Sequence, residues 1–335
     1  MELYPWQSAL WQKLLQARAR MPHALLLQGR SGIGKRDFAH KLAQSLLCDQ
    51  PRPDHTACGS CDSCGWFSQD NHPDFRLLEP EDRDAGDEAA GEAKGGKKTQ
   101  ISVDQVRELA DFLALSSHRA GLRIVLLCPA EALNPASANA LLKMLEEPPP
   151  AVIFLLVTHQ PQRLLATIRS RCSKITMPVP PRELAEAWLE RQGVARGAER
   201  LAFAGGAPLL AMNHDDESDR RLLELQAMLA EPQAMDPLAA ASHISKAGMV
   251  AVIDAMQKWT CDLLIACFAG EVRYHRLQAA AMQHLAKGVD LPKLLDYQRV
   301  LNEARRVSLH PLNNELQIES LMIQYTQLFL LSAKS

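Results

Sequence analysis

The stretch that decides the fold is residues 25–36, Leu-Leu-Leu-Gln-Gly-Arg-Ser-Gly-Ile-Gly-Lys-Arg. The apolar run 24–27 predicts a buried strand, and the glycines that follow let backbone N–H groups curl round a phosphate: Gly29, Gly32 and Gly34. Lys35 would place a positive charge on that phosphate. The pattern therefore predicts a phosphate-binding loop between a strand and a helix.

This loop departs from the pattern G-x-x-x-x-G-K-[ST] at its last position, where Arg36 stands in place of a hydroxyl residue. The missing hydroxyl is the group that holds Mg²⁺, and the metal neutralises the transferring phosphate. A second strand, 123–127, runs into Cys128-Pro129, where an active enzyme carries acidic residues. Because Pro129 turns the chain, we assign Glu131 to the turn that follows. We expect no ATP hydrolysis by this loop, while the retained glycines and Lys35 leave weak nucleotide binding open.

A cysteine cluster between these two motifs has the spacing of a metal site, with ligands at Cys48, Cys58, Cys61 and Cys64. Four thiolates at such spacings match a tetrahedral, structural zinc site, and His55 or His72 could replace one of them. The sequence shows no secretory signal or long apolar segment, so we expect a reducing, cytoplasmic compartment instead of disulfides. The remaining cysteines are interpreted as small core residues: Cys128, Cys172, Cys261 and Cys267.

A length of 335 residues predicts two or three domains. A composition of 47% hydrophobic but only 5% aromatic residues favours helix. A net charge of -2 argues against a protein that binds nucleic acid tightly by itself. Residues 79–100 are first acidic and then basic without apolar periodicity, which predicts a solvated, mobile insertion. A helix capped by Ser102 is expected next. Later apolar stripes predict helical core: Val252, Met256, Trp259, Leu263 and Cys267, then Leu316, Leu321, Tyr325 and Leu328.

Residues 138–149, Ala-Asn-Ala-Leu-Leu-Lys-Met-Leu-Glu-Glu-Pro-Pro, resemble the signature helix of clamp-loader AAA+ subunits. The strand after it ends at Thr158, where that superfamily places its sensor-1 residue. Ser170-Arg171-Cys172 is similar to the motif whose arginine reaches into a neighbouring subunit's ATP site. Together with Tyr4-Pro5-Trp6 and the cysteine cluster, the chain resembles the delta-prime family of bacterial DNA polymerase III from Tyr4 to about Leu330.

The resemblance implies an α/β P-loop AAA+ domain with a parallel sheet, an inserted zinc module, a small helical lid and an all-α C-terminal collar. The expected boundaries are 1–178, with the module at 48–64 and the insertion at 79–100, then 179–212 and 213–335. Leu209 lies where active relatives carry the sensor-2 arginine.

The expected function is that of a non-hydrolysing subunit that helps to load the sliding clamp onto primer-template DNA during DNA replication. Its partners would be tau/gamma and delta subunits of a DNA-directed DNA polymerase holoenzyme, a nucleotidyltransferase, with no membrane involved. Arg171 would act in trans as an arginine finger, zinc would be structural, and ATP would not be required in this subunit. An active ATPase and a zinc-dependent nucleic-acid-binding module are the alternatives.

Overall fold

The computed structural model describes residues 3–80, 100–114, 121–212, 216–268, 270–308 and 313–329. The chain divides into two compact units, 1–184 and 185–335. Residues 81–99 of the expected insertion lie outside the described residues. In the described part of the chain, no helix is both long enough and apolar enough to cross a membrane.

The first unit is built on a parallel sheet in the strand order β2-β3-β4-β1-β5. Its strands are β1 Ala24–Gln28, β2 Phe75–Leu78, β3 Arg123–Leu127, β4 Val152–Thr158 and β5 Ser173–Thr176. β3 and β4 are buried along their whole length. Helices cover both faces of a parallel sheet, which explains why these strands read as unbroken apolar runs.

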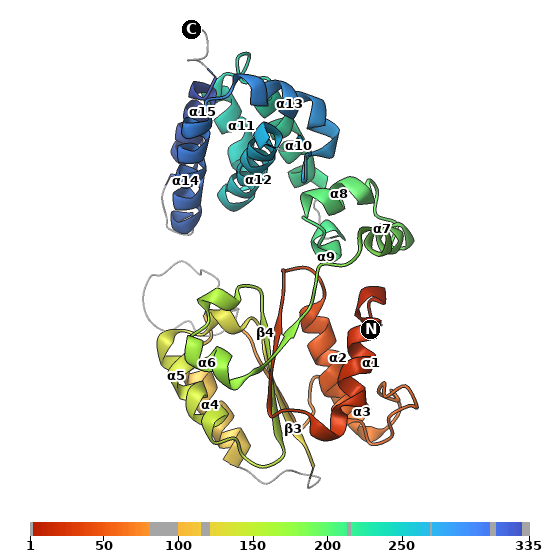
Figure 1. Cartoon of the computed structure of the whole chain (residues 1–335). Helices are drawn as coiled ribbons and strands as arrows, with labels where there is room; N and C mark the ends of the chain where they lie inside the picture. The colour runs from red at the N-terminus through yellow and green to blue at the C-terminus, as the bar shows by residue number, and fades with distance from the viewer. Residues whose placement is uncertain are drawn as a thin grey trace. The chain divides into compact units, whose positions relative to one another are not determined.

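Two layers of helices sandwich this sheet (Figure 1). One layer holds α1 Ser8–Gln16, α2 Lys35–Leu47 and α3 Asp62–Ser68, and the other holds α4 Val103–Ala114, α5 Pro135–Glu146 and α6 Ala166–Arg171. The second layer packs its apolar side chains on one set of alternating strand residues, including Leu26, Val125 and Phe154. Short 3-10 helices at Pro5–Gln7, Arg18–Arg20, Ala130–Ala132 and Pro161–Arg163 complete the described part of this unit.

Local capping fixes where the helices of the second layer begin. The Ser102 hydroxyl accepts a hydrogen bond from the Gln105 N–H at 3.3 Å, and the Gln105 side chain accepts one from the Ser102 N–H at 2.9 Å. This reciprocal pair is a capping box and confirms the predicted cap. Asn134 caps α5 through the Ser137 N–H at 2.9 Å, with Pro135 at the first helical position.

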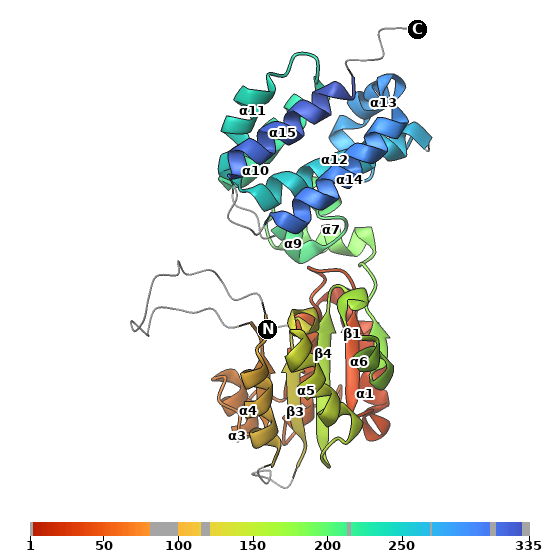
Figure 2. The ribbon, with the colours of Figure 1, turned by 90° about the vertical axis from the view of Figure 1, so that its left-hand side faces the viewer.

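The described residues of the second unit form helices and no strand (Figure 2). The helices are α7 Arg182–Arg191, α8 Gly197–Phe203, α9 Pro208–Met212, α10 Asp216–Ala230, α11 Pro237–Ile244, α12 Met249–Phe268, α13 Ala279–Gly288, α14 Leu291–Val307 and α15 Asn314–Gln327, with 3-10 helices at Ser245–Ala247 and Arg276–Gln278. Because α8 and α9 fall in the same compact unit as the later helices, the division into a lid and a collar stays a prediction.

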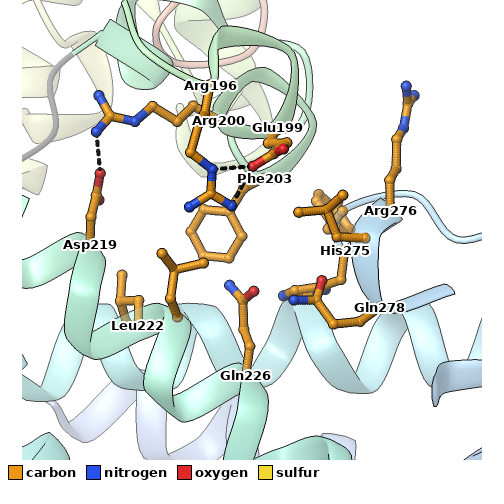
Figure 3. A pocket seen from close by; sticks show the side chains of 13 residues that line it. Arg196, Glu199, Arg200, Phe203, Asp219, Leu222, Gln226, His275, Arg276 and Gln278 are labelled. Atoms are coloured by element: carbon orange, nitrogen blue, oxygen red, sulfur yellow. Dashed lines mark hydrogen bonds and ion pairs between the residues drawn. The ribbon is translucent and has the colours of Figure 1, made fainter. Parts of the chain in front are cut away.

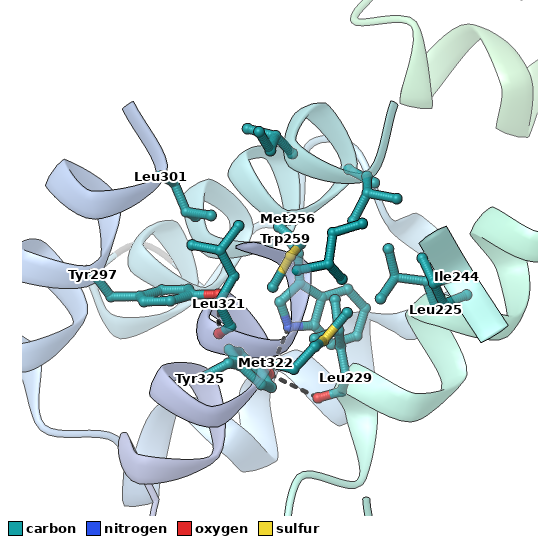
Figure 4. Close-up of a cluster of buried hydrophobic side chains, with 14 of the residues drawn as sticks. Leu225, Leu229, Ile244, Met256, Trp259, Tyr297, Leu301, Leu321, Met322 and Tyr325 are labelled. Carbon is teal, nitrogen blue, oxygen red and sulfur yellow. Dashed lines mark hydrogen bonds between the residues drawn. The ribbon is translucent and has the colours of Figure 1, made fainter. Parts of the chain in front are cut away.

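The core of the second unit is centred on Trp259 of α12 (Figure 4). Its indole N–H donates to the Tyr325 hydroxyl at 2.8 Å, and that hydroxyl donates to the Leu229 carbonyl at 2.7 Å. The predicted stripe on α12 is buried from Val252 to Leu263. The expectation for Leu316 is wrong, because its side chain is 60% exposed. It precedes Leu321 by five residues, which places it about 140° round the helix from that core position.

Candidate phosphate-binding loop and metal centre

The glycine-rich loop joins β1 to α2, as the sequence predicts. Gly32 and Gly34 have φ angles of 78° and 83°, a left-handed conformation that glycine adopts without steric cost. A Cβ on Gly34 would approach the Tyr4 ring to 2.4 Å, and a Cβ on Gly29 would approach the Met177 carbonyl oxygen to 2.4 Å. Gly34 is therefore favoured by both its backbone conformation and close packing, Gly29 by close packing and Gly32 by its backbone conformation.

The loop lies at the carboxyl end of β1, the edge at which parallel α/β sheets commonly bind ligands. The chain leaving β1 crosses to β2 at one edge of the sheet, whereas the chain leaving β4 crosses to β5 at the other edge. Ligand sites in such sheets are typical where the connections from two neighbouring strands run to opposite edges. Thr158 ends β4 directly beside Gln28 of β1, and its buried hydroxyl accepts a hydrogen bond from the Gln160 N–H at 3.2 Å.

The N-terminal segment is packed onto the far end of the loop. The Trp6 indole N–H donates to the Ile33 carbonyl at 3.0 Å, and the Gln7 amide donates to the Gly34 carbonyl at 2.8 Å. The rings of Tyr4 and Trp6 stack with their centroids 5.0 Å apart. The motif Tyr4-Pro5-Trp6 thus fixes the conformation of the loop where α2 begins.

The side chain of Lys35 points toward the backbone of the glycine-rich loop. The side chain is 2% exposed, and its Nζ donates to the Arg30 carbonyl at 2.5 Å. Burial lowers the pKa of Lys35 to about 8, while the nearby groups Glu131 and Cys128 act in the opposite direction. The ammonium group is therefore engaged by the backbone that would otherwise surround a phosphate.

Arg36 forms a two-pronged ion pair with Glu79, the residue that follows β2. Its Nε lies 2.5 Å from one carboxylate oxygen, and its Nη2 donates to the other at 3.0 Å. Leu78 pairs with Leu127 in the sheet, so Glu79 and Cys128 follow neighbouring strand ends. Burial raises the pKa of the Cys128 thiol to about 12, which keeps it protonated at neutral pH. A guanidinium and a neutral thiol therefore stand at the two positions where metal ligands are expected, and neither suits Mg²⁺.

Glu131 and His159 lie close to Lys35; the sequence interpretation named Glu131 only as part of a turn and did not name His159. One Glu131 carboxylate oxygen accepts a hydrogen bond from the His159 N–H at 2.9 Å. Burial lowers the pKa of His159, and the Lys35 charge lowers it further. Glu131 lies in the 3-10 turn Ala130–Ala132 that follows Pro129, as the sequence interpretation expects, and this turn keeps its carboxylate beside the end of β4. The available signal was an acidic residue four positions beyond the end of the apolar strand β3.

The cysteine cluster is assembled as a tetrahedral site. The Sγ atoms of Cys48 and Cys61 lie 3.9 Å apart, those of Cys58 and Cys64 3.9 Å, and those of Cys48 and Cys64 3.6 Å. All four sulfurs lie within 4.8 Å of one another. Four Zn–S bonds of about 2.3 Å in a tetrahedron separate the sulfurs by about 3.8 Å. The four side chains therefore fit a zinc ion.

Backbone N–H groups favour the thiolate form of Cys58, whereas burial raises the pKa of Cys48 and of Cys64. Cys58 Sγ accepts hydrogen bonds from the N–H groups of Ser60 and Cys61, each at 3.4 Å, and these bonds lower the pKa of Cys58 to about 6. The Cys61 sulfur caps α3 by accepting from the Cys64 N–H at 3.4 Å. Since the thiolate is the form that binds metal, the N–H groups around Cys58 favour metal binding by that residue.

The histidine alternatives are not supported by the geometry. His72 bonds to the Ser63 hydroxyl through Nε2 at 2.9 Å and to the Asp74 N–H through Nδ1 at 3.0 Å. Neither His55 nor His72 joins the group of potential ligands found among the described residues. The other cysteines lie outside this group and are buried or half-buried: Cys128, Cys172, Cys261 and Cys267.

Arg171 ends α6 and contacts the signature helix, not the loop. Its Nη2 lies 2.6 Å from a Glu146 carboxylate oxygen on α5, and its Nη1 donates to the Thr167 carbonyl at 3.0 Å. The side chains of Arg171 and Glu146 are 35% and 47% exposed, so the pair lies at the surface of the first unit. Leu209 lies in α9 of the second unit.

Known proteins resemble this chain along most of its length. The family model described as "DNA polymerase III, delta subunit" matches residues 6–181. DNA polymerase III subunit delta' of Pseudomonas aeruginosa is 35% identical, with 98% of each chain covered. The protein of the same name from Yersinia pestis is 31% identical over 97% of this chain and 96% of its own. A solved gamma subunit-related protein from Thermotoga maritima is 18% identical, with a TM-score of 0.43 over 95% of this chain and 99% of that one. On the family model and these two relatives, the chain belongs to the DNA polymerase III delta' family.

Proposed function

We propose that this chain is the delta' subunit of a bacterial clamp loader and helps to place the sliding clamp on primer-template DNA during replication, without hydrolysing ATP itself. Its partners would be the tau/gamma and delta subunits of the DNA polymerase III holoenzyme. Family membership supports the clamp-loader role. The observation that carries the absence of hydrolysis is the ion pair between Arg36 and Glu79 beside the phosphate-binding loop.

The physical argument concerns charge at the metal position. Phosphoryl transfer relies on a metal that bridges the phosphate oxygens and neutralises their developing charge. Arg36 supplies a fixed positive charge, but a guanidinium presents only donors and therefore cannot coordinate a metal. The Glu79 carboxylate largely neutralises this charge, because its two oxygens accept hydrogen bonds from Nε and Nη2 of Arg36. The loop is thus suited to weak, metal-independent anion contact at most.

The active chemistry of the complex would then belong to neighbouring subunits. Arg171 is partly exposed at the end of α6, and its guanidinium is held by Glu146 in a defined direction. A fixed fork of donors suits the terminal phosphate of ATP bound by an adjacent subunit. Arg171 would therefore serve as an arginine finger in trans.

The cysteine cluster would hold one structural zinc ion through Cys48, Cys58, Cys61 and Cys64. A site with four protein ligands leaves no open position for water or substrate, so the bound metal would supply folding energy and not catalysis. It would tie the end of α2 to the start of α3.

Hydrolysis by the isolated chain tests the proposal against the active-ATPase alternative. We expect no phosphate release above the level of a heat-denatured sample, with Mg²⁺ or Mn²⁺ present. The same preparation, mixed with tau/gamma and delta, should form a complex in which one copy of this chain is found by native mass spectrometry. ATP turnover by the isolated chain, or failure to enter the complex, would contradict the assignment.

A further inference from the structure

A pocket in the second unit takes no part in the proposed function. It has a volume of about 110 Å³ and lies between α8, α10 and the 3-10 helix 276–278. Figure 3 shows Phe203, Leu222, Gln226 and His275 converging on one space from these elements. The glycine-rich loop and the cysteine cluster belong to the first unit, so this pocket is a separate feature.

The walls of the pocket are mainly apolar. Phe203 and Leu222 form part of its lining, and Leu223 and Leu277 lie at its border with 37% and 64% of their surfaces exposed. Exposed apolar side chains next to a concave apolar surface mark binding sites more often than isolated ones do. An apolar group that entered the pocket would remove these surfaces from water.

A buried hydrogen-bond acceptor lies in the lining. His275 is 2% exposed, and its Nδ1 lies 2.9 Å from a carboxylate oxygen of Asp262. Because that carboxylate accepts hydrogen bonds, it fixes a ring proton on Nδ1 and leaves Nε2 as the nitrogen that can accept. Nε2 is buried and has no hydrogen-bond partner in the described part of the chain. A buried acceptor without a donor is costly, so a donor that reached it would be bound favourably.

The border of the pocket also carries an unbalanced positive charge. Arg196 pairs with Glu199, and Arg200 pairs with Asp219 at 3.0 Å. Arg276, by contrast, forms no ion pair with any residue that the structure describes, and Figure 3 shows it rising along one side of the pocket. An anionic group beside the pocket would complement this charge.

We propose that the pocket binds a tyrosine side chain that stands next to an acidic residue in a segment of a partner protein. The phenol ring would contact Phe203 and Leu222, and its hydroxyl would donate to His275 Nε2. The neighbouring carboxylate would face Arg276. The exposed Leu223 and Leu277 offer apolar contact to the rest of such a segment, which a free amino acid would not use.

Three short peptides separate these contributions when each is titrated into the full chain and followed by NMR chemical shifts. The reference probe is acetyl-Gly-Asp-Tyr-Gly-amide. Replacing Tyr by Phe removes the donor and should weaken binding about three- to tenfold. Replacing Asp by Asn removes the charge and should weaken it about two- to fivefold. Equal binding of all three peptides, or no saturable binding, overturns the proposal. N-acetyl-tyrosine amide binding as tightly as the reference peptide overturns the assignment to a protein segment.

Variants of the chain locate the site. Leu223→Trp should abolish binding by filling the pocket, and Arg276→Gln should remove the difference between the Asp and Asn peptides. Arg299→Gln, on the exposed face of α14, is the matched control and should change nothing. His275→Phe should remove the preference for Tyr over Phe. Undiminished binding to folded Leu223→Trp would show that the peptide binds elsewhere.

Discussion

Arg36 changes the chemistry of its loop by replacing an oxygen ligand with a permanent cation. The cation is held by both carboxylate oxygens of Glu79. Restoring the hydroxyl alone should not restore hydrolysis, because Cys128 still offers no carboxylate for the metal. We therefore expect the isolated Arg36→Thr variant to release no phosphate from ATP in a coupled assay. Measurable turnover by this single variant would show that one residue, and not the whole metal site, disables the loop.

The fork of Arg171 matters as well as its charge. Arg171→Lys keeps the charge but loses the bidentate donors, so the reconstituted complex should load clamps more slowly, by about tenfold or more if the fork contacts phosphate. Arg107→Ala, another exposed arginine in the first unit, should load at the parental rate. If the complex with Arg171→Lys loads clamps at the parental rate, only the positive charge of Arg171 matters and not its bidentate donors.

We expect Glu146 to orient the guanidinium of Arg171 and to contribute little to the folding stability of the chain. The pair is partly exposed, and such pairs contribute only about 0–1 kcal/mol to folding. Glu146→Gln should therefore leave the unfolding midpoint of the chain unchanged and lower the clamp-loading rate about two- to fivefold, because the guanidinium loses its fixed direction. Glu147→Gln, its exposed neighbour on the same segment, is the control. A lowered midpoint with normal loading would make Glu146 structural.

At the residue scale, the sequence predicts those site residues that lie close to one another along the chain. The loop glycines, Lys35 and the cysteines stand at characteristic spacings, so their places follow from the pattern itself. The contacts of Arg36 with Glu79 and of Glu131 with His159 join residues 43 and 28 positions apart. Such contacts depend on which strand ends meet at the edge of the sheet, and a single sequence does not specify that order.

The element formed by the end of α2, the cysteine loop and α3 should depend on its metal. Purified protein should contain about one zinc per chain by atomic emission, since four thiolates form one closed site. Cys58→Ser combined with Cys61→Ser should lose the metal and open this element locally, seen as faster amide exchange around α3. Cys261→Ser, outside the cluster, should retain both metal and protection. A double variant that stays metal-loaded and equally protected would refute the zinc site.

The helices of the second unit are joined by a buried polar chain through Tyr325. Tyr325→Phe removes the hydroxyl that accepts from Trp259 and donates to Leu229, which leaves two buried groups unsatisfied. The free energy of unfolding should fall by about 1–3 kcal/mol in urea titrations. Leu316→Ala, at an exposed position of the same helix, should change it by less than about 0.5 kcal/mol. Similar losses in both variants would mean that the hydroxyl has no special role.

At the same scale, apolar periodicity predicted α12 well but misplaced Leu316. A stripe on a helix of 20 residues such as α12 has enough turns to define one face. Leu316 lies in the first turn of α15, where the pattern has only begun and a single apolar residue does not indicate which way it points. Helix existence therefore follows from the sequence more reliably than the orientation of its first turn.

The whole molecule has the glycine-rich loop of a nucleotide-binding fold and carries Arg36 and Cys128 where we expect metal ligands in active relatives. The first unit combines the parallel sheet, the glycine-rich loop and the buried Lys35, and we expect no metal chemistry at that loop. Family membership places this chain among the delta' subunits. Its contribution to a complex should then come from the surfaces and the arginine that it presents to other subunits.

The most direct test compares Lys35→Ala with Arg171→Ala in the same reconstituted complex, measuring ATP turnover and clamp loading on primed DNA. Lys35→Ala removes the charge from this chain's own loop and should leave both rates at the parental level. Arg171→Ala should assemble normally and lower both rates, because a neighbouring site loses its finger. The opposite result, a large fall for Lys35→Ala with normal rates for Arg171→Ala, would show that the loop of this chain is the active site and would contradict the account.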